Sequence, residues 1–380
     1  MQVQVESPPS PHLEAMDVAL DFSDGYDSIR DVVSKFLFKG FGGVRLDQLK
    51  GGITNVLLKG STPDGRIEFL IRAYGRGTSA LINRDREYET HVHLLSKGLA
   101  PPLYARFQNG LVYGFISGKP VRYQDLSHPT IVRGVSSRLA QWHAVLDAKA
   151  IDSKMTRIGK PYSKDLYDLL DKWLDVVPED VLGKTRQELR TELEWFKGLP
   201  SAQTSPVVVA HCDLLSGNIL VPEGTDLEDG VVTDGDFKYS LDASFAPCEL
   251  VKFIDYEYTM PAPRAFDLAN HFMEWQGFDC VTELIPDPSH SNPVLRFWCY
   301  NYLSSVRHYG SSSVDSSQPV TEKDIDELID EVRTWWGMPG FYWGIWAAVQ
   351  STISDIDFDY ASYARSRLSE YYAWKNSLNN

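Results

Sequence analysis

The stretch Val207-Val-Val-Ala-His211-Cys-Asp213-Leu-Leu-Ser-Gly-Asn218-Ile-Leu-Val221 decides how the rest of the chain is interpreted. A short apolar run ends in His211-x-Asp213, four residues separate Asp213 from Asn218, and a second apolar run follows. Short apolar runs with polar borders predict strands, so the stretch predicts a strand, a polar loop and another strand. Asp255 ends a third apolar run further along the chain. A lone aspartate in a turn is usually structural, but three polar residues at such strand ends predict a site.

The residue types and their spacing match a kinase catalytic centre. There, one aspartate accepts the proton of the nucleophilic hydroxyl, while an asparagine and a second aspartate hold Mg²⁺ against the nucleotide phosphates. Phosphoryl transfer needs positioning and charge stabilisation more than covalent chemistry, so a few rigidly held groups suffice. We therefore predict Asp213 as the catalytic base, and Asn218 and Asp255 as the magnesium ligands.

Length and cysteine content limit the class of protein. The chain has 380 residues, 43% of them hydrophobic, so it can bury a large core as one two-lobed unit or two domains. Its four cysteines form no Cys-x-x-Cys pair, which disfavours disulfide frameworks and zinc sites. No segment approaches the roughly 20 apolar residues of a membrane span, and the first residues do not resemble a signal peptide. We expect a cytoplasmic protein without stable membrane insertion.

The formal net charge is −15. Nucleic-acid phosphates require basic patches, so we expect no nucleic-acid partner. An acidic surface would attract a small cationic substrate. Solubility explains the same charge equally well, so net charge alone does not decide between the two interpretations.

The N-terminal part of the chain predicts a small sheet. Residues 1–15 contain several prolines and predict a disordered leader, and apolar residues at helical spacing follow over 17–37. Two alternating runs, 51–59 and 66–72, flank the turn Pro63-Asp-Gly65 and predict a β-hairpin.

A helix predicted over 82–97 and a strand over 111–116 complete the makeup of a kinase N-lobe. We assign 16–116 to this nucleotide-binding lobe and 117–380 to a second lobe, mostly of helical periodicity, that carries the catalytic loop and the substrate pocket. The acidic stretch 222–248 is rich in glycine and aspartate and predicts a loop or insertion without an assigned role.

Three glycine-containing segments are candidates for phosphate binding. In Gly51-Gly52-Ile-Thr54-Asn55, glycines let backbone N–H groups approach phosphate, and a Thr or Asn side chain adds a donor. Such a Gly-Gly turn is usually only a turn, and Lys39-Gly-Phe-Gly-Gly43 is a weaker candidate of the same kind. Gly183-Lys-Thr185 resembles the end of a P-loop, but Pro178 occupies the position of the first glycine, so we reject it.

Arg72 ends an apolar run, and Glu87 falls on the next predicted helix. A strand cation tied to a helix acid positions the nucleotide phosphates in kinases. As an isolated ion pair the two residues would be structural, but beside the Asp213 centre we predict a functional pair.

The segment 264–275 places four polar side chains on one helical face. They are spaced i, i+3, i+4 and i+7 and comprise Asp267, Asn270, His271 and Glu274. A solvated helix face would explain them as easily. Because this helix begins shortly after Asp255, we predict Asp267 as an acceptor that orients the catalytic loop through His211.

Trp343, Trp346 and Gln350 share one helical stripe. An aromatic stripe is usually core packing. Together with the carboxylates of Glu257 and Glu274, however, it also provides the ring faces and anions that hold an ammonium ion. The sequence therefore predicts a pocket for a small ammonium compound, with core packing as the alternative.

From about Asp31 to Trp374 the sequence resembles the choline/ethanolamine kinase family, which is related to aminoglycoside phosphotransferases and more distantly to protein kinases. The motifs that carry the resemblance are Gly51-Gly-Ile-Thr-Asn55, Leu70-Ile-Arg72-Ala-Tyr-Gly75, His211-Cys-Asp213-Leu-Leu-Ser-Gly-Asn218, Ile254-Asp255-Tyr-Glu257-Tyr258, Phe266-Asp267-Leu-Ala-Asn-His271-Phe-Met-Glu274-Trp275 and Trp343-Gly-Ile-Trp346. The resemblance implies an α+β, two-lobed protein-kinase-like fold with a small β-rich N-lobe and a large, mainly helical C-lobe. It also implies ATP with Mg²⁺ as the phosphoryl donor and an amino alcohol as the acceptor.

Several stretches are more similar to ethanolamine kinases than to choline kinases. They include Ile82-Asn-Arg-Asp85, Ser205-Pro-Val-Val-Val209, Asp213-Leu-Leu215 and Ser351-Thr-Ile-Ser-Asp-Ile-Asp-Phe358. The resemblance thus implies phosphorylation of ethanolamine to phosphoethanolamine, the first step of the CDP-ethanolamine route to phosphatidylethanolamine. Family members often dimerise, so a homodimer is an open alternative.

Carried over by position, the resemblance implies that Phe115 and Ile116 form the adenine hinge and that His211 acts in the catalytic loop with Asp213. The residues that it implies for the amino-alcohol pocket are Glu257, Tyr258, Glu274, Trp343, Trp346 and Tyr363. The sequence departs from the family pattern at Cys212, where asparagine is usual, and at Phe278-Asp279, where a pocket tyrosine is expected.

Three alternatives to an ethanolamine kinase remain. A choline kinase, or an enzyme with both activities, belongs to the same class. An aminoglycoside-type phosphotransferase would need an open acidic pocket for a polycation, whereas the tryptophan stripe suits a compact ammonium. A catalytically inactive scaffold should have lost a base or metal residue, yet Asp213, Asn218 and Asp255 are all present.

Overall fold

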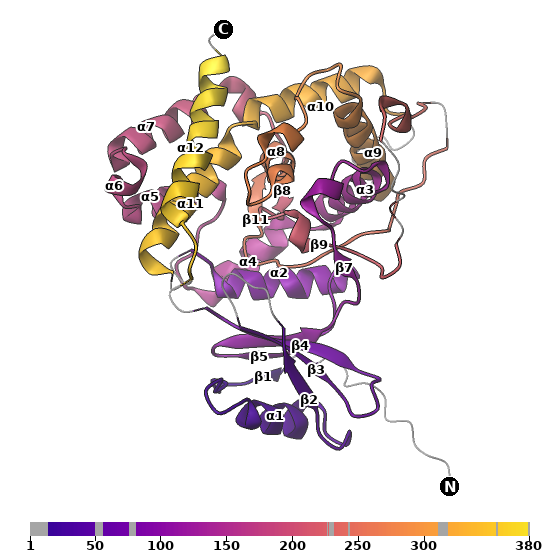
Figure 1. The fold of residues 1–380 in the computed structure, drawn as a ribbon, viewed down its shortest axis with the longest axis vertical. Coiled ribbons are helices and arrows are strands. Elements are labelled where there is room, and N and C mark those ends of the chain that lie inside the picture. Colours follow the sequence, from indigo (N-terminus) through magenta and orange to yellow (C-terminus); the bar gives the residue numbers. More distant parts are fainter. Residues whose placement is uncertain are drawn as a thin grey trace. The chain divides into compact units, whose positions relative to one another are not determined.

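The computed structural model describes residues 14–49, 56–75, 81–225, 227, 232–241, 244–310, 318–354 and 356–378 (Figure 1). The chain divides into two compact units. The smaller one comprises Met1–Ala80 and Leu94–Ser117, and the larger one comprises Leu81–His93 and Gly118–Asn380. Helix α2 (Arg84–Ser96) crosses this boundary. The lobes predicted from the sequence, 16–116 and 117–380, stay a prediction.

The smaller unit contains a six-stranded sheet in the order β1-β5-β6-β4-β3-β2. Its strands are β1 (Glu14–Ala15), β2 (Arg45–Gln48), β3 (Val56–Ser61), β4 (Glu68–Ala73), β5 (Leu103–Phe107) and β6 (Gly110–Gly114). Strand β1 is parallel to β5, and the other neighbours are antiparallel. The predicted hairpin is present as β3 and β4, in which Ser61 is opposite Glu68. Strands β1, β2 and β5 were not predicted.

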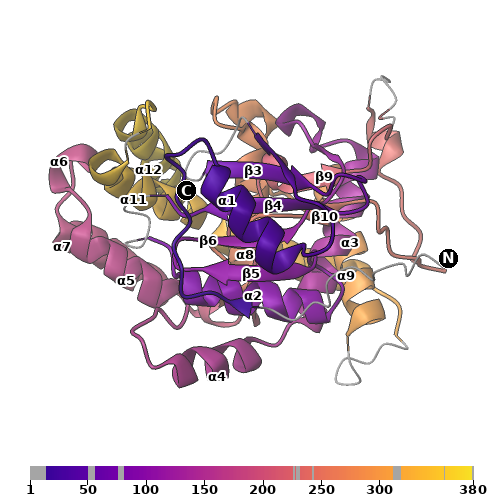
Figure 2. The same ribbon diagram turned by 90° about the horizontal axis from the view of Figure 1, so that it is seen from below.

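Helix α1 (Asp27–Val32) and the π-helical turn η1 (Val33–Leu37) lie over one face of this sheet (Figure 2). Ile29 and Val33 contribute to its apolar core, where the ring of Phe38 stacks on that of Phe69 at 4.4 Å. The helical spacing seen over 17–37 therefore gives helix only from Asp27 onward. Tyr26 just before it has φ 71°, a left-handed backbone that no helix can include.

The larger unit is mainly helical, as Figure 1 shows. After α2 come α3 (Pro129–Val145), α4 (Ala148–Ile158), α5 (Leu166–Val176), α6 (Glu179–Leu182), α7 (Arg186–Lys197), α8 (Arg264–Met273), α9 (Pro293–Tyr309), α10 (Glu322–Trp335), α11 (Met338–Ile353) and α12 (Tyr360–Ser377). Helix α8 packs against α10 and α11, α3 packs against α9, and α11 packs against α12. The rejected P-loop is a helix junction: Gly183 (φ 62°) follows α6, and Thr185 forms a capping box with Glu188 at the start of α7.

Two small sheets in the larger unit contain the segment 207–221. Strand β8 (Val207–Ala210) is antiparallel to β11 (Met260–Pro263). Strand β9 (Ile219–Val221) lies between β7 (Lys119–Pro120) and β10 (Lys252–Phe253). The predicted strand, polar loop and strand are thus confirmed as β8, residues 211–218 and β9. Helix α8 follows β11 directly, which brings its first turns to the same place.

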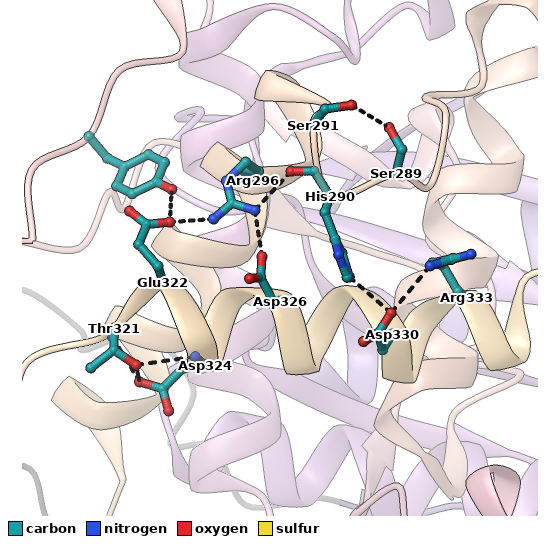
Figure 3. Close-up of polar contacts among 11 residues, drawn as sticks. Ser289, His290, Ser291, Arg296, Thr321, Glu322, Asp324, Asp326, Asp330 and Arg333 are labelled. Carbon is teal, nitrogen blue, oxygen red and sulfur yellow. Dashed lines mark hydrogen bonds and ion pairs between the residues drawn. The ribbon is translucent and has the colours of Figure 1, made fainter.

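The acidic stretch 222–248 has, among its described residues, one 3₁₀ turn, η6 (Asp234–Asp236), and no strand or α-helix. Beyond that turn the chain packs on α9 and α10. The ring of Tyr239 stacks on that of Tyr300 at 4.5 Å, and its hydroxyl donates to Glu322. Glu322 also pairs with Arg296, which bonds Asp326 at 2.6 Å (Figure 3). Side chains of two helices therefore hold this part of the predicted loop.

Candidate active site

The structure brings Asp213 and Asn218 together. The Asn218 side-chain amide, in the 3₁₀ turn η5 (Ser216–Asn218), donates to the backbone oxygen of Asp213 at 2.8 Å and to its carboxylate at 3.0 Å. Both residues are largely buried. Because the nitrogen of the Asn218 amide faces Asp213, its oxygen is the atom left to accept from, or coordinate, a ligand.

Asp255 reaches the same place through the β9–β10 pairing. Phe253 lies opposite Ile219, and the backbone N–H of Ile254 donates to the carbonyl of Asn218 at 3.0 Å. Asp255 follows directly and has φ 64°, a left-handed backbone that aspartate tolerates better than most residues. The turn therefore changes the chain direction at the predicted metal-binding carboxylate.

Asp267, on α8, fixes the backbone of the catalytic loop. Its fully buried carboxylate accepts the backbone N–H groups of His211 and Cys212, each at 2.8 Å. It also accepts Nε2 of His143 at 2.9 Å. Burial raises the pKa of this carboxyl, but the bonds from His143 and the Cys212 amide outweigh it, and the pKa lies below its usual value. The predicted contact through His211 is thus made by two backbone amides and not by the His211 ring.

Two more side chains of α8, besides Asp267, bond to the backbone of the catalytic loop. The Asn270 side chain donates to the carbonyl of Cys212 at 3.0 Å, and Nδ1 of His271 donates to the carbonyl of Leu214 at 3.0 Å. Trp275 donates to the other ring nitrogen of His271 at 3.2 Å. A solvated face, the alternative considered for this helix, is therefore wrong, because its polar side chains are buried and bonded to the loop.

Cys212 occupies the one strained position of the loop. Its φ of 63° is left-handed, a conformation that asparagine adopts far more readily than cysteine. Asparagine is the residue that the family pattern has at this position. A left-handed backbone at a residue that is not glycine costs about 1–3 kcal/mol, and the bond that Cys212 donates to Asp267 and the bond that it accepts from Asn270 have to offset this cost.

The His211 ring is buried among aromatic side chains and points away from Asp267. Its Nε2 donates to the carbonyl of Ile254 at 3.1 Å, and its ring lies 5.3 Å from that of Trp142. Burial lowers the pKa of His211 to about 4, so the imidazole is neutral at pH 7. In the described part of the chain its Nδ1 has no hydrogen-bond partner. This geometry suits a residue that positions the loop.

Three carboxylates act electrostatically on Asp213 at this site. The pKa of Asp213 is raised well above its usual value, first by burial and then by the charges of Asp255, Glu274 and Glu257, whereas the bond from Asn218 lowers it. Such mutual repulsion is stable only with compensating positive charge. The side chains that supply part of it were not predicted.

Two arginines pair with the carboxylates predicted for the ammonium pocket. Arg84 on α2 bonds Glu257 at 2.9 Å and Glu87 at 2.8 Å. Arg367 on α12 is fully buried and bonds Glu274 at 3.0 Å. Both glutamates therefore carry a counter-charge already. Nothing in the local sequence indicated these pairs, because Arg84 and Arg367 lie far along the chain from their partners.

The tryptophan stripe of α11 faces Tyr258. Trp346 donates from its indole to the Tyr258 hydroxyl at 2.8 Å, and Trp343 donates to the Asn270 side-chain oxygen at 2.8 Å. The ring of Tyr258 lies 5.7 Å from that of Trp343, edge to face. Tyr363 packs instead with other side chains, including Phe278 at 6.2 Å and the Arg367 guanidinium at 5.8 Å.

The predicted nucleotide residues are distributed between the units. Gly51, Gly52, Thr54 and Asn55 lie outside the described residues. Arg72 lies on β4 of the smaller unit, and Glu87 lies on the part of α2 that belongs to the larger unit, where it bonds Arg84. The pairing of Arg72 with Glu87 stays a prediction.

At the predicted hinge, the Phe115 N–H donates to the Glu68 carbonyl at 3.0 Å, and Nζ of Lys59 lies 3.8 Å from the centre of the Phe115 ring. Ile116 follows it.

Two absences hold within the described ranges. No group of three or more histidine, cysteine or carboxylate side chains there is arranged to hold a metal ion by itself. None of the helices in these ranges is long and apolar enough to cross a membrane.

The family assignment follows from comparison with known proteins. Residues 46–372 match the family model for choline/ethanolamine kinases. The chain is 32% identical to ethanolamine kinase 1 of Mus musculus, over 87% of this chain and 84% of that protein. The chain therefore belongs to the choline/ethanolamine kinase family, whose members are ATP-dependent kinases.

Solved structures show the same fold. An ethanolamine kinase of Plasmodium vivax aligns with a TM-score of 0.70 and 26% identity, covering 90% of this chain and 86% of that one. A choline kinase of Cryptosporidium parvum aligns with a TM-score of 0.61 and 19% identity, covering 88% and 90%. The α+β, two-lobed protein-kinase-like fold expected from the sequence is confirmed.

The buried histidines predict how the stability of the larger unit depends on pH. Burial lowers the pKa of both His211 and His271 to about 4, whereas an unfolded histidine titrates near 6.5. Below pH 6.5 the unfolded state therefore binds protons that the native state does not. Stability is complete above this pH and is lost as the pH falls toward 4. Between pH 7 and pH 5 we expect a loss of about 2 kcal/mol per histidine.

Urea unfolding at several pH values measures this loss. In His271→Asn the asparagine amide can still donate to Leu214. The free energy of unfolding of this variant should fall less steeply between pH 7 and pH 5, because one proton fewer is taken up on unfolding. A wild-type stability that does not change between pH 7 and pH 5 would contradict the assignment of neutral buried rings.

Proposed function

We propose that this chain transfers the γ-phosphoryl group of ATP to the hydroxyl of ethanolamine and so supplies phosphoethanolamine for phospholipid synthesis. The observation that carries the proposal is the Asp213–Asn218 pair, held by Asp267 at the end of β8 and next to Asp255. Membership of the choline/ethanolamine kinase family and the similarity to ethanolamine kinases support the reaction and the substrate.

In this proposal Asp213 accepts the proton of the ethanolamine hydroxyl. The Asn218 amide holds the Asp213 carboxylate by one of its oxygens, so that the other oxygen is available to the substrate. Asp213 acts as a base only when it is ionised, and because burial and the neighbouring carboxylates raise its pKa, positive charge close to it is needed to keep it ionised. His211 acts only by positioning the loop, through its bond to Ile254.

The donor set at this site suits Mg²⁺. Asn218 offers an amide oxygen and Asp255 a carboxylate, and both are the hard oxygen ligands that Mg²⁺ prefers. Few protein ligands are needed, because Mg²⁺ in kinases is completed by phosphate oxygens and water. When bound, the ion would supply positive charge against both the nucleotide phosphates and the four site carboxylates. The nucleotide roles of Gly51, Gly52, Thr54, Asn55, Arg72, Glu87, Phe115 and Ile116 stay predictions.

For the ammonium group we propose the aromatic faces of Tyr258, Trp343 and Trp346, with Glu257 and Glu274 as the surrounding negative charge. The two glutamates are already paired with Arg84 and Arg367. The rings therefore have to contribute more of the contact than the sequence suggested. Aromatic faces also accept a trimethylammonium group, so choline is the second candidate substrate.

A direct comparison of the two amino alcohols tests the proposed function. Phosphorylation of ethanolamine and of choline should be measured at identical ATP and Mg²⁺ concentrations. We expect kcat/KM for ethanolamine to be higher by at least about tenfold, which corresponds to about 1.4 kcal/mol. A higher kcat/KM with choline would show that choline, and not ethanolamine, is the preferred substrate. No transfer to either compound would refute the kinase proposal.

Substitution of the proposed base should abolish most of the rate. Asp213→Asn keeps the shape of the side chain but cannot accept the proton, so we expect kcat to fall by roughly 10²–10⁴-fold. Nucleotide affinity should change little. Asp330→Asn, which removes an exposed carboxylate on α10, is the matched control and should keep the wild-type rate. A folded Asp213→Asn protein with near-normal kcat would sink the assignment.

The proposed ammonium site predicts a selective effect at Trp346. Trp346→Phe removes the hydrogen bond to Tyr258 and part of the ring face, so KM for ethanolamine should rise by roughly 2- to 30-fold. KM for ATP should stay the same. Trp335→Phe is the matched control, because Trp335 is fully buried against Phe196 and Phe266. It should lower the melting temperature without changing either KM. The same pattern in Trp346→Phe would show that the α11 stripe is core.

A further inference from the structure

Arg86 is a buried cation without a carboxylate partner in the described part of the chain. It lies on α2, in the segment that belongs to the larger unit, and is 2% exposed. The one side-chain hydrogen bond that it makes there joins Nη1 to the carbonyl of Ser163 at 2.8 Å. Its Nε–H is also buried and has no partner among the described residues.

Two other arginines inside the larger unit, the buried Arg367 and the partly buried Arg264, are paired with carboxylates. Arg367 bonds Glu274 and also contacts Glu370, and Arg264 bonds Glu331 at 2.6 Å. This is the usual arrangement, because a buried charge without a counter-charge is strongly destabilising. Arg86 departs from it. A guanidinium stays protonated in proteins, so Arg86 cannot avoid the cost by losing its proton.

The groups that face Arg86 electrostatically are the thiol of Cys212 and the phenol of Tyr342. Burial raises the pKa of both well above their usual values, so neither supplies a negative charge at pH 7. The Tyr342 hydroxyl is buried and has no partner in the described ranges. The indole N–H of Trp173, whose ring lies 4.8 Å from that of Tyr342, has none there either.

These three side chains come from α2, α5 and α11, and all of them offer hydrogen-bond donors. Among the described residues, no carboxylate bonds to any of these three donors. The ligand has to be small, because Arg86, Trp173 and Tyr342 are shielded almost completely from solvent. A halide ion meets these conditions, since it accepts from several donors without a required geometry and carries the one charge that balances Arg86.

We propose that Arg86 binds a chloride-sized inorganic anion in the interior of the larger unit, beneath the catalytic loop at Cys212. The anion accepts the Arg86 Nε–H and neutralises the guanidinium, and Tyr342 and Trp173 are the neighbouring donors. Occupation of this site stabilises the unit that carries the catalytic loop.

Thermal unfolding in sodium chloride and in sodium gluconate at equal ionic strength tests the proposal. Chloride at about ten times its dissociation constant should raise the wild-type melting temperature by roughly 2–4 °C relative to gluconate. Arg86→Met should lose this difference. The matched control is Arg264→Met, which removes a paired, partly buried arginine and should keep the full chloride effect whatever its own stability.

A second measurement uses only the wild-type protein, so it does not depend on the folding of a variant. Crystals grown or soaked in sodium bromide should show an anomalous bromide peak within hydrogen-bonding distance of the Arg86 guanidinium. Equal wild-type melting temperatures in chloride and gluconate, a chloride effect that persists in Arg86→Met, or no bromide at Arg86 would each overturn the proposal. The last result would leave water, or a carboxylate from outside the described ranges, as the partner of Arg86.

Discussion

The site depends on the carboxylate of Asp267. It holds consecutive backbone amides, those of His211 and Cys212, at the point where the chain turns through a left-handed residue. A non-glycine residue in this conformation costs about 1–3 kcal/mol. Hydrogen bonds to a buried charged acceptor contribute about 1.5–3 kcal/mol each, so two of them exceed the cost. The loop therefore keeps a shape that its own sequence does not favour.

From this constraint the positions of the reactive groups follow. Because the loop is fixed by Asp267, Asn270 and His271 of α8, the Asp213 carboxylate and the Asn218 amide meet at its far end. The β9–β10 pairing then delivers Asp255 to them. A rigid loop matters for phosphoryl transfer, since catalysis there relies on positioning and charge more than on covalent chemistry.

The charged side chains of the larger unit neutralise one another only in part. The charges of Asp255, Glu257 and Glu274 all act on Asp213 and raise its pKa. Glu87 and Glu257 both bond to Arg84. Arg84 and Arg367 offset only part of this charge. The remaining negative charge suits a site for a metal–nucleotide complex and an ammonium compound. Around Arg86 the uncompensated charge is positive, whereas at the active site it is negative.

The parts of the fold that were predictable from the sequence are those set by short-range patterns. The strand–loop–strand of 207–221, the β3–β4 hairpin and the helix that carries Asp267 all follow from apolar spacing within a few residues. The buried polar face of α8 did not, because spacing alone cannot distinguish a face that bonds a loop from one that meets solvent. The left-handed Cys212 was also invisible, since cysteine is not a residue that signals such a turn.

Long-range partners were beyond the reach of sequence reasoning. Arg84 and Arg367 bond carboxylates more than 90 residues away, and no local pattern marks them. His143, which bonds Asp267 from α3, is a single histidine in an otherwise ordinary amphipathic helix.

Hydrogen–deuterium exchange of Asp267→Asn tests the central claim most directly. An asparagine side chain has only one acceptor oxygen and cannot serve both amides of His211 and Cys212 as the carboxylate does. We predict much faster exchange in peptides that cover 207–221, with unchanged exchange in the strands of the smaller unit and in the control Asp330→Asn. Equal protection of 207–221 in the wild type and in Asp267→Asn would contradict the account.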